Sequence, residues 1–264
     1  NDTLKAIAAS LLLYVRLSDP AARAVRETAA TPDDSLLPDG AQAMLTLANG
    51  KTLVLDDSMH GVLASQAGTA IRRTADGSIQ YDSRAMEATG QPPPYNTFST
   101  PKGHSHRLIL PDGTRVWLNT ASAIRFPVAF TGSERTVTLV GEAYFEVAHD
   151  RSKPFHVLAN GSTIQVLGTH FNVSAYADDA RVVTTLLEGA VNVSRDGRNI
   201  ALNPGEQAIV DGHTGRMWQS QADMQSVMAW KNGYFRFNDE GIESIINKVS
   251  KWYDIEKVAY QGQF

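Results

Sequence analysis

Residues 45–55, LTLANGKTLVL, can be laid over residues 108–118, LILPDGTRVWL, without a gap. Each stretch has an Asn-Gly or Asp-Gly dipeptide near its centre, and weaker copies run over 71–81 and 191–202. Asn, Asp and Gly tolerate the positive φ that tight hairpin turns need, and alternating apolar residues give each arm one buried face. The repeated unit therefore predicts a chain built mostly of β-hairpins.

Short strands are predicted throughout residues 104–215. Apolar residues alternate within them, and glycines separate them at short, regular intervals. Spacing of this kind favours a mainly β fold, either an antiparallel β-sandwich or a solenoid-like curled sheet. The predicted strands are 116–118, 123–126, 136–140, 142–147, 155–158, 162–166, 170–176, 182–187, 190–193 and 207–210.

Length and composition limit the class of protein. The 264 residues can form one large domain, or a main domain with a smaller one. The formal net charge is -4 and the only adjacent basic pair is Arg72-Arg73, which argues against a nucleic-acid-binding surface. Because the chain has no cysteine, disulfides and zinc sites built on thiolates are excluded.

The first 43 residues are predicted to form a membrane-proximal helix and a linker, with the linker over 18–43. Residues 6–15 are apolar, and a helical stripe is formed by Leu4, Ile7, Leu11 and Val15. A bilayer span needs about 20 apolar residues. The run is therefore either a packed amphipathic helix or the remnant of a membrane anchor. Because residue 1 is not Met, we expect the chain to be a fragment or a processed product.

The pattern changes near residue 223 and predicts a partial β-α-β domain over 223–264, following an all-β domain over 44–222. Within the smaller domain, 234–237 and 255–260 are predicted as strands. Asn238 or Asp239 is predicted to cap the helix between them. That helix is indicated by apolar residues three and four apart, namely Ile242, Ile245, Ile246, Val249, Trp252 and Tyr253.

No motif in the sequence predicts an enzyme or a cofactor. His104 and His106 share a strand face, as some metal ligands do, but the apolar residues 108–110 stand where a carboxylate ligand would be needed. Glu142 and Glu146 are about 13 Å apart along a strand, wider than the pairs of retaining or inverting glycosidases. Nucleophile elbows, phosphate-binding loops and dinucleotide fingerprints are absent from the sequence.

Two other functions remain open from the residues alone. In the first, Glu142, Glu146, Glu188 and neighbouring aromatic residues line the groove of a carbohydrate-binding or carbohydrate-processing β-protein. In the second, His104 and His106 hold the metal of a β-barrel enzyme. Direct glycan binding would favour the first, and stoichiometric metal in the purified protein would favour the second.

Five motifs in a fixed order resemble the FecR family of membrane-bound anti-sigma regulators. The resemblance runs from about residue 43 to residue 264. Residues 45–55 and the Trp252-Tyr253-Asp254 segment resemble the branch found in Bacteroidetes-type bacteria, where such proteins serve uptake of iron chelates or glycans. The motifs are LPDGTRVWLN (110–119), GEAYFEV (141–147), KPF (153–155), VLGTHFNV (166–173) and LNPGEQA (202–208).

The resemblance implies the periplasmic part of a single-pass inner-membrane protein. That part would read the state of a TonB-dependent outer-membrane transporter through the signalling domain of the transporter. The family's cytoplasmic domain, which holds an extracytoplasmic-function sigma factor, has no counterpart in this chain, so we do not expect the chain to bind a sigma factor itself. Residues 223–264 resemble the first half of the short domain shared by secretins and TonB-dependent transporters.

Tyr234 and Arg236 are the predicted contact residues for the transporter. If 234–237 is a strand whose Phe235 and Phe237 pack under the helix, the two other side chains point outward. An exposed strand edge nearby could also accept a strand of the partner.

Overall fold

The structure is a computed structural model that describes residues 43–56, 58–83, 92–238 and 240–253. These residues belong to one compact unit, 31–264. The predicted helix and linker of the first 43 residues lie outside the described part, except for Ala43, and so does the strand predicted for 255–260. Among the described residues, no helix is both long enough and apolar enough to cross a membrane.

Eighteen strands in the described residues form two sheets that share one long strand, β10 (Arg135–Glu146). The first sheet has the spatial order β2 (Thr52–Leu55), β1 (Ala43–Thr46), β6 (Tyr95–Thr100), β9 (Ser122–Pro127), β10, β11 (Phe155–Ala159), β12 (Ser162–Val166), β15 (Val191–Arg195), β16 (Arg198–Leu202). The second has the order β3 (Gly61–Gln66), β4 (Thr69–Arg73), β5 (Ile79–Ser83), β7 (His106–Ile109), β8 (Arg115–Leu118), β10, β13 (His170–Ala175), β14 (Arg181–Glu188), β17 (Glu206–Asp211), β18 (Met217–Gln221). Only the β10–β11 and β5–β7 pairs of these described strands are parallel.

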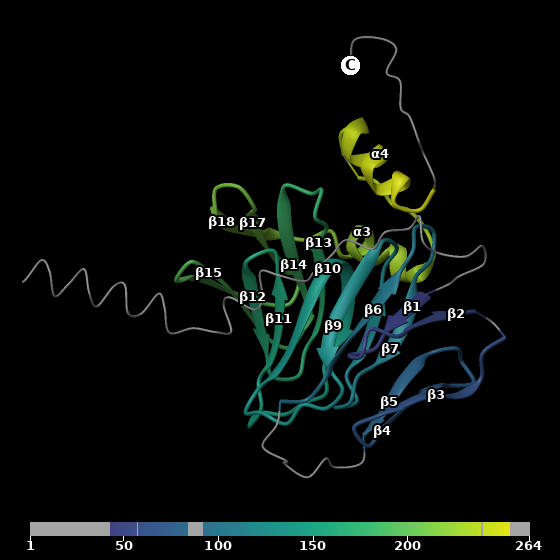
Figure 1. Ribbon diagram of the computed structural model, residues 1–264. Coiled ribbons are helices and arrows are strands. Elements are labelled where there is room, and N and C mark those ends of the chain that lie inside the picture. The colour runs from purple at the N-terminus through teal and green to yellow at the C-terminus, as the bar shows by residue number, and fades with distance from the viewer. Residues whose placement is uncertain (1–42, 57, 84–91, 239, 254–264) are drawn as a thin grey trace, which may run out of the picture. The chain divides into compact units, whose positions relative to one another are not determined.

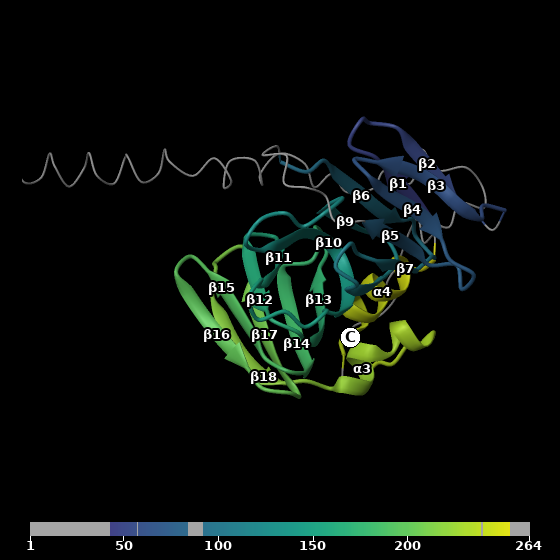
Figure 2. The same ribbon diagram turned by 90° about the horizontal axis from the view of Figure 1, so that it is seen from below.

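Strand β10 passes from the first sheet to the second at Gly141. Residues before it pair with β9 and β11, and residues from Gly141 onward pair with β8 and β13. Gly141 has φ +90°, and a Cβ there would collide with Ser122. The Ser122 hydroxyl also accepts a hydrogen bond from the Glu142 backbone N–H at 2.9 Å. Glycine at this position therefore allows β10 to cross from one sheet to the other. The crossing joins the two sheets into one curled sheet, as the strands from β10 to β18 show in Figure 2.

The predicted hairpins are all present, and two kinds of turn close them. In the turn before Thr114, the Gly113 N–H donates to the Leu110 carbonyl and only Gly113 has positive φ, +85°. Asp112 accepts a hydrogen bond from the Thr114 N–H at 3.0 Å, which fixes this three-residue loop. The turns at Gly50 and Gly77 have the same backbone hydrogen bonds. At 196–197 both residues have positive φ, which gives a two-residue turn instead.

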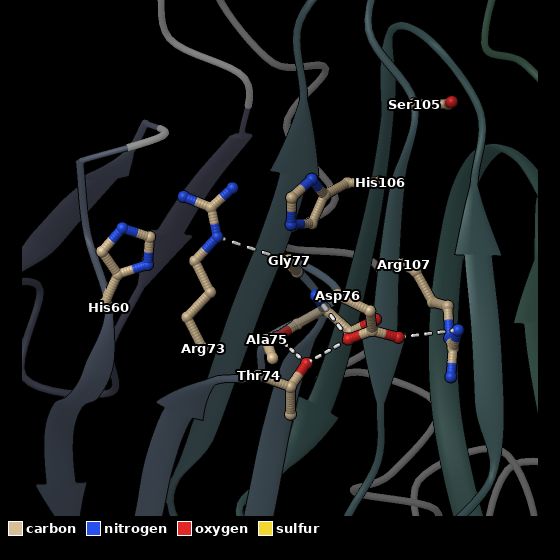
Figure 3. A pocket seen from close by; sticks show the side chains of 10 residues that line it. His60, Arg73, Thr74, Ala75, Asp76, Gly77, Ser105, His106 and Arg107 are labelled. Carbon is tan, nitrogen blue, oxygen red and sulfur yellow. Dashed lines mark hydrogen bonds and ion pairs between the residues drawn. The ribbon is translucent and has the colours of Figure 1, made fainter.

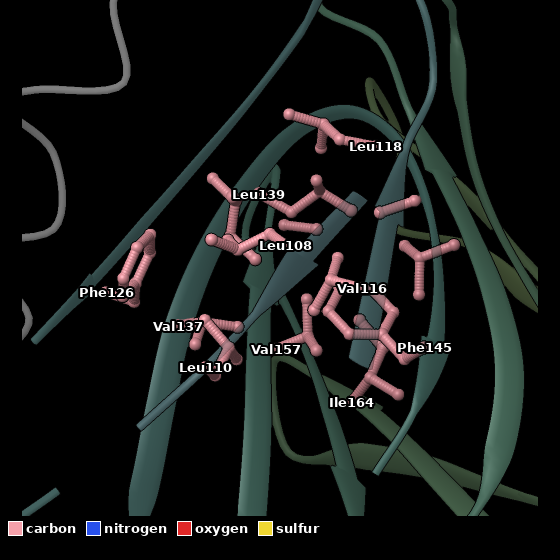
Figure 4. Close-up of a cluster of buried hydrophobic side chains, with 14 of the residues drawn as sticks. Leu108, Leu110, Val116, Leu118, Phe126, Val137, Leu139, Phe145, Val157 and Ile164 are labelled. Carbon is pink, nitrogen blue, oxygen red and sulfur yellow. The ribbon is translucent and has the colours of Figure 1, made fainter. Parts of the chain in front are cut away.

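One hydrophobic core lies between the two sheets, and Figure 4 shows part of it. Phe145 of the second sheet stacks on Phe171 with ring centroids 5.0 Å apart and meets Phe155 of the first sheet at 6.2 Å. All three rings are completely buried. The predicted mainly β fold is thus confirmed. The ten predicted strands all occur, with 136–140 and 142–147 as parts of β10.

The chain after β18 forms a short helical segment, drawn in yellow in Figure 1. It contains α3 (Met224–Met228), the 3-10 helix η2 (Trp230–Asn232) and α4 (Ile242–Ser250). The predicted helix is confirmed, but Gly241 occupies its N-cap instead of Asn238 or Asp239. We call the described residues of 222–253 the C-terminal segment and those of 43–221 the β region.

The prediction of a strand at 234–237 is wrong, because these residues have no strand structure. A strand satisfies its backbone groups by pairing with a neighbour. Instead, the Tyr234 N–H turns back and donates to the Ala229 carbonyl at 3.1 Å. The first strand of the predicted β-α-β unit is therefore absent. The division into domains at residue 223 stays a prediction.

Candidate interaction surface

Four aromatic side chains of the C-terminal segment meet in what we call the aromatic cluster: Phe235, Phe237, Trp252 and Tyr253. Phe235 lies at its centre. It stacks on Phe237 at 5.9 Å, meets Trp252 edge-on at 6.0 Å and lies 6.2 Å from Tyr253. The exposed fractions are 39% for Phe235 and 59% for Tyr253. These rings thus pack on one another while much of their surface remains in contact with solvent.

Exposed apolar surface is concentrated in this segment. Of the eight exposed large hydrophobic residues in the described chain, five lie between 234 and 253. None of the described residues of α4 is buried, although its apolar residues follow the spacing of a helix that packs on a core. Exposed apolar side chains that gather in one part of a protein mark an interaction site more often than scattered ones do. The five residues are Tyr234, Phe235, Phe237, Ile242 and Tyr253.

The predicted contact residues Tyr234 and Arg236 both lie at the surface beside the aromatic cluster. Tyr234 is 48% exposed. Arg236 makes a loose, half-exposed ion pair, with its Nε 3.8 Å from Asp223 Oδ2. Asp223 also caps α3 and accepts from Asn238, and these hydrogen bonds lower the pKa of its carboxyl. The strand alternation that motivated the prediction is absent, so the role of the two residues stays a prediction.

The acidic residues of the predicted sugar groove all have partners already. Glu146 pairs with Arg115 at 2.6 Å, and Glu188 pairs with His170 at 3.1 Å. The Glu142 carboxylate accepts hydrogen bonds from the side-chain amides of Asn119 and Asn172, each at 2.8 Å. Burial raises the pKa of the Glu142 carboxyl, and these two hydrogen bonds oppose the rise.

The motifs of the sequence contact one another through internal hydrogen bonds and ion pairs of this kind. Glu142 belongs to the motif 141–147, and it joins Asn119 of the motif 110–119 to Asn172 of the motif 166–173. In the same way Asp112 forms a largely enclosed ion pair with Arg135 at 2.8 Å, and Arg135 donates to the Lys153 carbonyl of the KPF motif. These polar side chains of the motifs are therefore engaged in contacts within the protein.

One pocket of about 490 Å³ opens between the hairpin of β4 and β5 and strand β7 (Figure 3). Its polar groups bind one another: Arg107 pairs with Asp76 at 3.0 Å, and Arg73 Nε donates to the Gly77 carbonyl at 3.3 Å. His106 lines the pocket and His104 does not. In the part of the chain that the structure describes, no three His, Asp or Glu side chains gather as metal ligands would.

The comparisons with known proteins agree with this arrangement. The model of the family described as FecR protein matches residues 96–192, from the start of β6 to the start of β15. Two crystal structures of a "putative anti-sigma factor" from Parabacteroides distasonis, at 2.50 and 1.65 Å resolution, are each 36% identical with a TM-score of 0.58. The alignments cover 61% and 60% of this chain, and 75% and 74% of the other. A comparison with curated proteins found no match.

The fold and the contacts between its motifs define a β scaffold that presents exposed aromatic side chains at its C-terminal end. The chain belongs to the FecR family of anti-sigma regulators.

Proposed function

We propose that the chain is the periplasmic, signal-sensing part of a transmembrane anti-sigma regulator. It would relay the state of a TonB-dependent outer-membrane transporter to an extracytoplasmic-function sigma factor. Membership of the FecR family supports the regulatory role. The sigma factor would be bound by a cytoplasmic domain outside this sequence, and a membrane anchor would connect the two.

The exposed aromatic cluster is the observation that carries the proposal. The motif carboxylates Glu142 and Asp112 are engaged inside the β region, whereas large apolar side chains stand exposed on the C-terminal segment. Aromatic residues and Arg supply most of the binding energy at protein interfaces. Tyr234 and Arg236, beside four aromatic rings, therefore suit the docking of a folded partner domain, and we assign that partner as the signalling domain of the transporter.

The test is isothermal titration calorimetry of the complete chain with each signalling domain carried by the TonB-dependent transporters of the same genome. We expect the wild-type chain to bind one of them. The double substitution Tyr234→Ala/Arg236→Ala should weaken binding at least about 10-fold, since a central Tyr or Arg commonly contributes more than about 1.4 kcal/mol.

A matched control exists in the β region, where Arg125 lies 4.2 Å over the ring of the 37% exposed Tyr95. Tyr95→Ala/Arg125→Ala removes the same two residue types and should leave the affinity within about 2-fold. If the wild-type chain binds none of the signalling domains, the relay is wrong. If the two double variants bind equally, the assignment of Tyr234 and Arg236 is wrong while the relay stands.

A further inference from the structure

The last residue before the aromatic pair Trp252-Tyr253 is a lysine whose own side chain is almost enclosed. Lys251 is only 9% exposed as a residue. Its ammonium lies 3.3 Å from Asp178 Oδ2 and 3.2 Å from Asp179 Oδ1, both on the loop after β13. The same ammonium stands 4.4 Å over the ring of Tyr176. A lysine is rarely enclosed unless it is paired, and here two carboxylates and a ring of the β region pair with it.

The backbone and the helix next to Lys251 join the same site. Its carbonyl accepts a hydrogen bond from the Thr120 hydroxyl at 2.6 Å and from the Gly103 N–H at 3.3 Å. One turn earlier on α4, Asn247 accepts from the lysine ammonium at 2.6 Å and donates to Asp179 at 2.9 Å. We call this set of contacts the Lys251 clasp.

The clasp contrasts with the rest of α4. No residue of the helix is buried, and its other ion pair, Lys248 with Glu240, is local to the segment and has a 51% exposed lysine side chain. The orientation of the helix end on the β region is therefore fixed by polar contacts of defined direction. Hydrogen bonds and ion pairs impose such a direction, and apolar contact alone does not.

The clasp also determines where two rings of the aromatic cluster stand. Trp252 and Tyr253 follow Lys251 directly, whereas Phe235, which they contact, precedes α4. Gly103 allows the backbone of Trp252 to lie close to the β region, because a Cβ at residue 103 would be only 3.0 Å from the Trp252 carbonyl oxygen. The side-chain hydrogen bonds and ion pairs that join the described residues at the end of α4 to the β region are those of the clasp.

We propose that Lys251 is the positioning residue of the interaction surface, which it preorganises by fixing the end of α4 to Asp178, Asp179 and Thr120. The affinity part of this proposal rests on the proposed function. A surface that is already assembled loses less conformational freedom when a partner binds, so the clasp raises affinity without touching the partner.

The first test needs no partner. Hydrogen–deuterium exchange of the complete chain is compared for wild type, Lys251→Met and Lys248→Met, which remove the same charge from neighbouring turns. We expect Lys251→Met to speed exchange over 242–253 by at least about 10-fold, and Lys248→Met by no more than about 2-fold. Exchange in β10, β13 and β14 should be unchanged in both.

A variant on the β region separates the clasp from an effect on the helix itself. Asp179→Asn leaves the sequence of α4 intact, and it should speed exchange over 242–253 in the same way. Equal exchange in Lys251→Met and Lys248→Met, or wild-type exchange in Asp179→Asn, would overturn the proposal.

The second test is the affinity for the signalling domain used above. Lys251→Met should weaken binding by about 10-fold while Lys248→Met does not. If the wild-type chain binds but Lys251→Met binds equally well, the positioning role is wrong and the proposed function stands. If the wild-type chain does not bind at all, the proposed function is wrong, and the exchange experiment alone decides whether the clasp fixes the helix.

Discussion

The β region and the C-terminal segment are built from similar residues but are held together differently. In the β region, aromatic rings such as Phe145 are fully buried and polar ties such as Asp112–Arg135 are enclosed. In the C-terminal segment, Phe235 remains 39% exposed and the Lys248–Glu240 pair is on the surface. The ordered motifs therefore build an enclosed support. The exposed rings lie outside that support, on the surface where we propose that a partner binds.

The largest expected difference concerns two glycines with nearly the same backbone conformation. Gly141 has φ +90° and Gly233 has φ +80°. An alanine side chain at either site costs about 1–2 kcal/mol in the left-handed region. At Gly141 the new Cβ would also overlap the backbone of Ser122, whereas nothing lies within 4 Å at Gly233. We therefore expect Gly141→Ala to lose more than about 5 kcal/mol and Gly233→Ala about 1 kcal/mol.

Soluble yield and urea unfolding of the two alanine variants measure this difference. Gly141→Ala should accumulate little folded protein, because that loss is comparable with the whole net stability of a domain. A Gly141→Ala protein as stable as Gly233→Ala would show that β10 can pass between the sheets without glycine.

The next difference concerns two phenylalanines. Phe145 is completely buried and packs on Phe171 and Phe155, so Phe145→Ala should cost about 3–5 kcal/mol through lost burial and a cavity. Phe235→Ala removes a ring that is still 39% exposed and should cost less than about 1 kcal/mol. Urea midpoints of the purified variants provide the measurement. A larger loss for Phe235→Ala would mean that the aromatic cluster is a second core and not a binding surface.

The parts of the fold that the sequence predicts correctly are those set by local chemistry. A glycine such as Gly113, placed after an aspartate that can accept from the backbone two residues on, closes a hairpin without help from elsewhere. The crossing of β10 at Gly141 depends on contact with Ser122, which lies in a different strand, β9. The spacing of glycines alone therefore does not predict it.

The candidate site illustrates the same limit. Residues 234–237 have the composition of a strand, but a strand also needs a neighbour to pair with, which no local pattern supplies. Lys251 meets Asp178 and Asp179 across 73 and 72 residues of sequence, so the clasp is visible only in three dimensions. The sequence did offer one signal for this surface, the apolar stripe from Ile242 to Val249. Such a stripe normally packs on a core, but no described residue of α4 is buried.

The smallest expected effect concerns the polar tie at Glu142. Burial raises the pKa of this carboxyl above its ordinary value of 4.5, so the folded protein binds its proton more tightly than the unfolded chain does. The stability that this proton contributes is fully present below the unfolded pKa and is lost as the pH rises through the folded pKa. Glu142→Gln, which carries no titrating proton, should therefore become more stable relative to the wild type as the pH increases. The direct cost of the substitution itself should be about 1 kcal/mol, because one of the two hydrogen bonds from Asn119 and Asn172 loses its acceptor.

Urea unfolding of both proteins between about pH 4 and pH 8 measures that relative stability.

The charged groups that act on Glu142 are Lys248, which lowers its pKa, and Asp179, which raises it. Both come from the side of the protein where the C-terminal segment is clasped. Repeating the comparison in the Lys248→Met background therefore tells whether the segment contributes to the tie: removing this cation should raise the folded pKa further and widen the pH window of the effect. If the stability difference between wild type and Glu142→Gln stays constant across this pH range, the Glu142 carboxylate is as well solvated as an exposed one. The contrast between enclosed polar contacts in the β region and exposed ones in the C-terminal segment would then not hold at this residue.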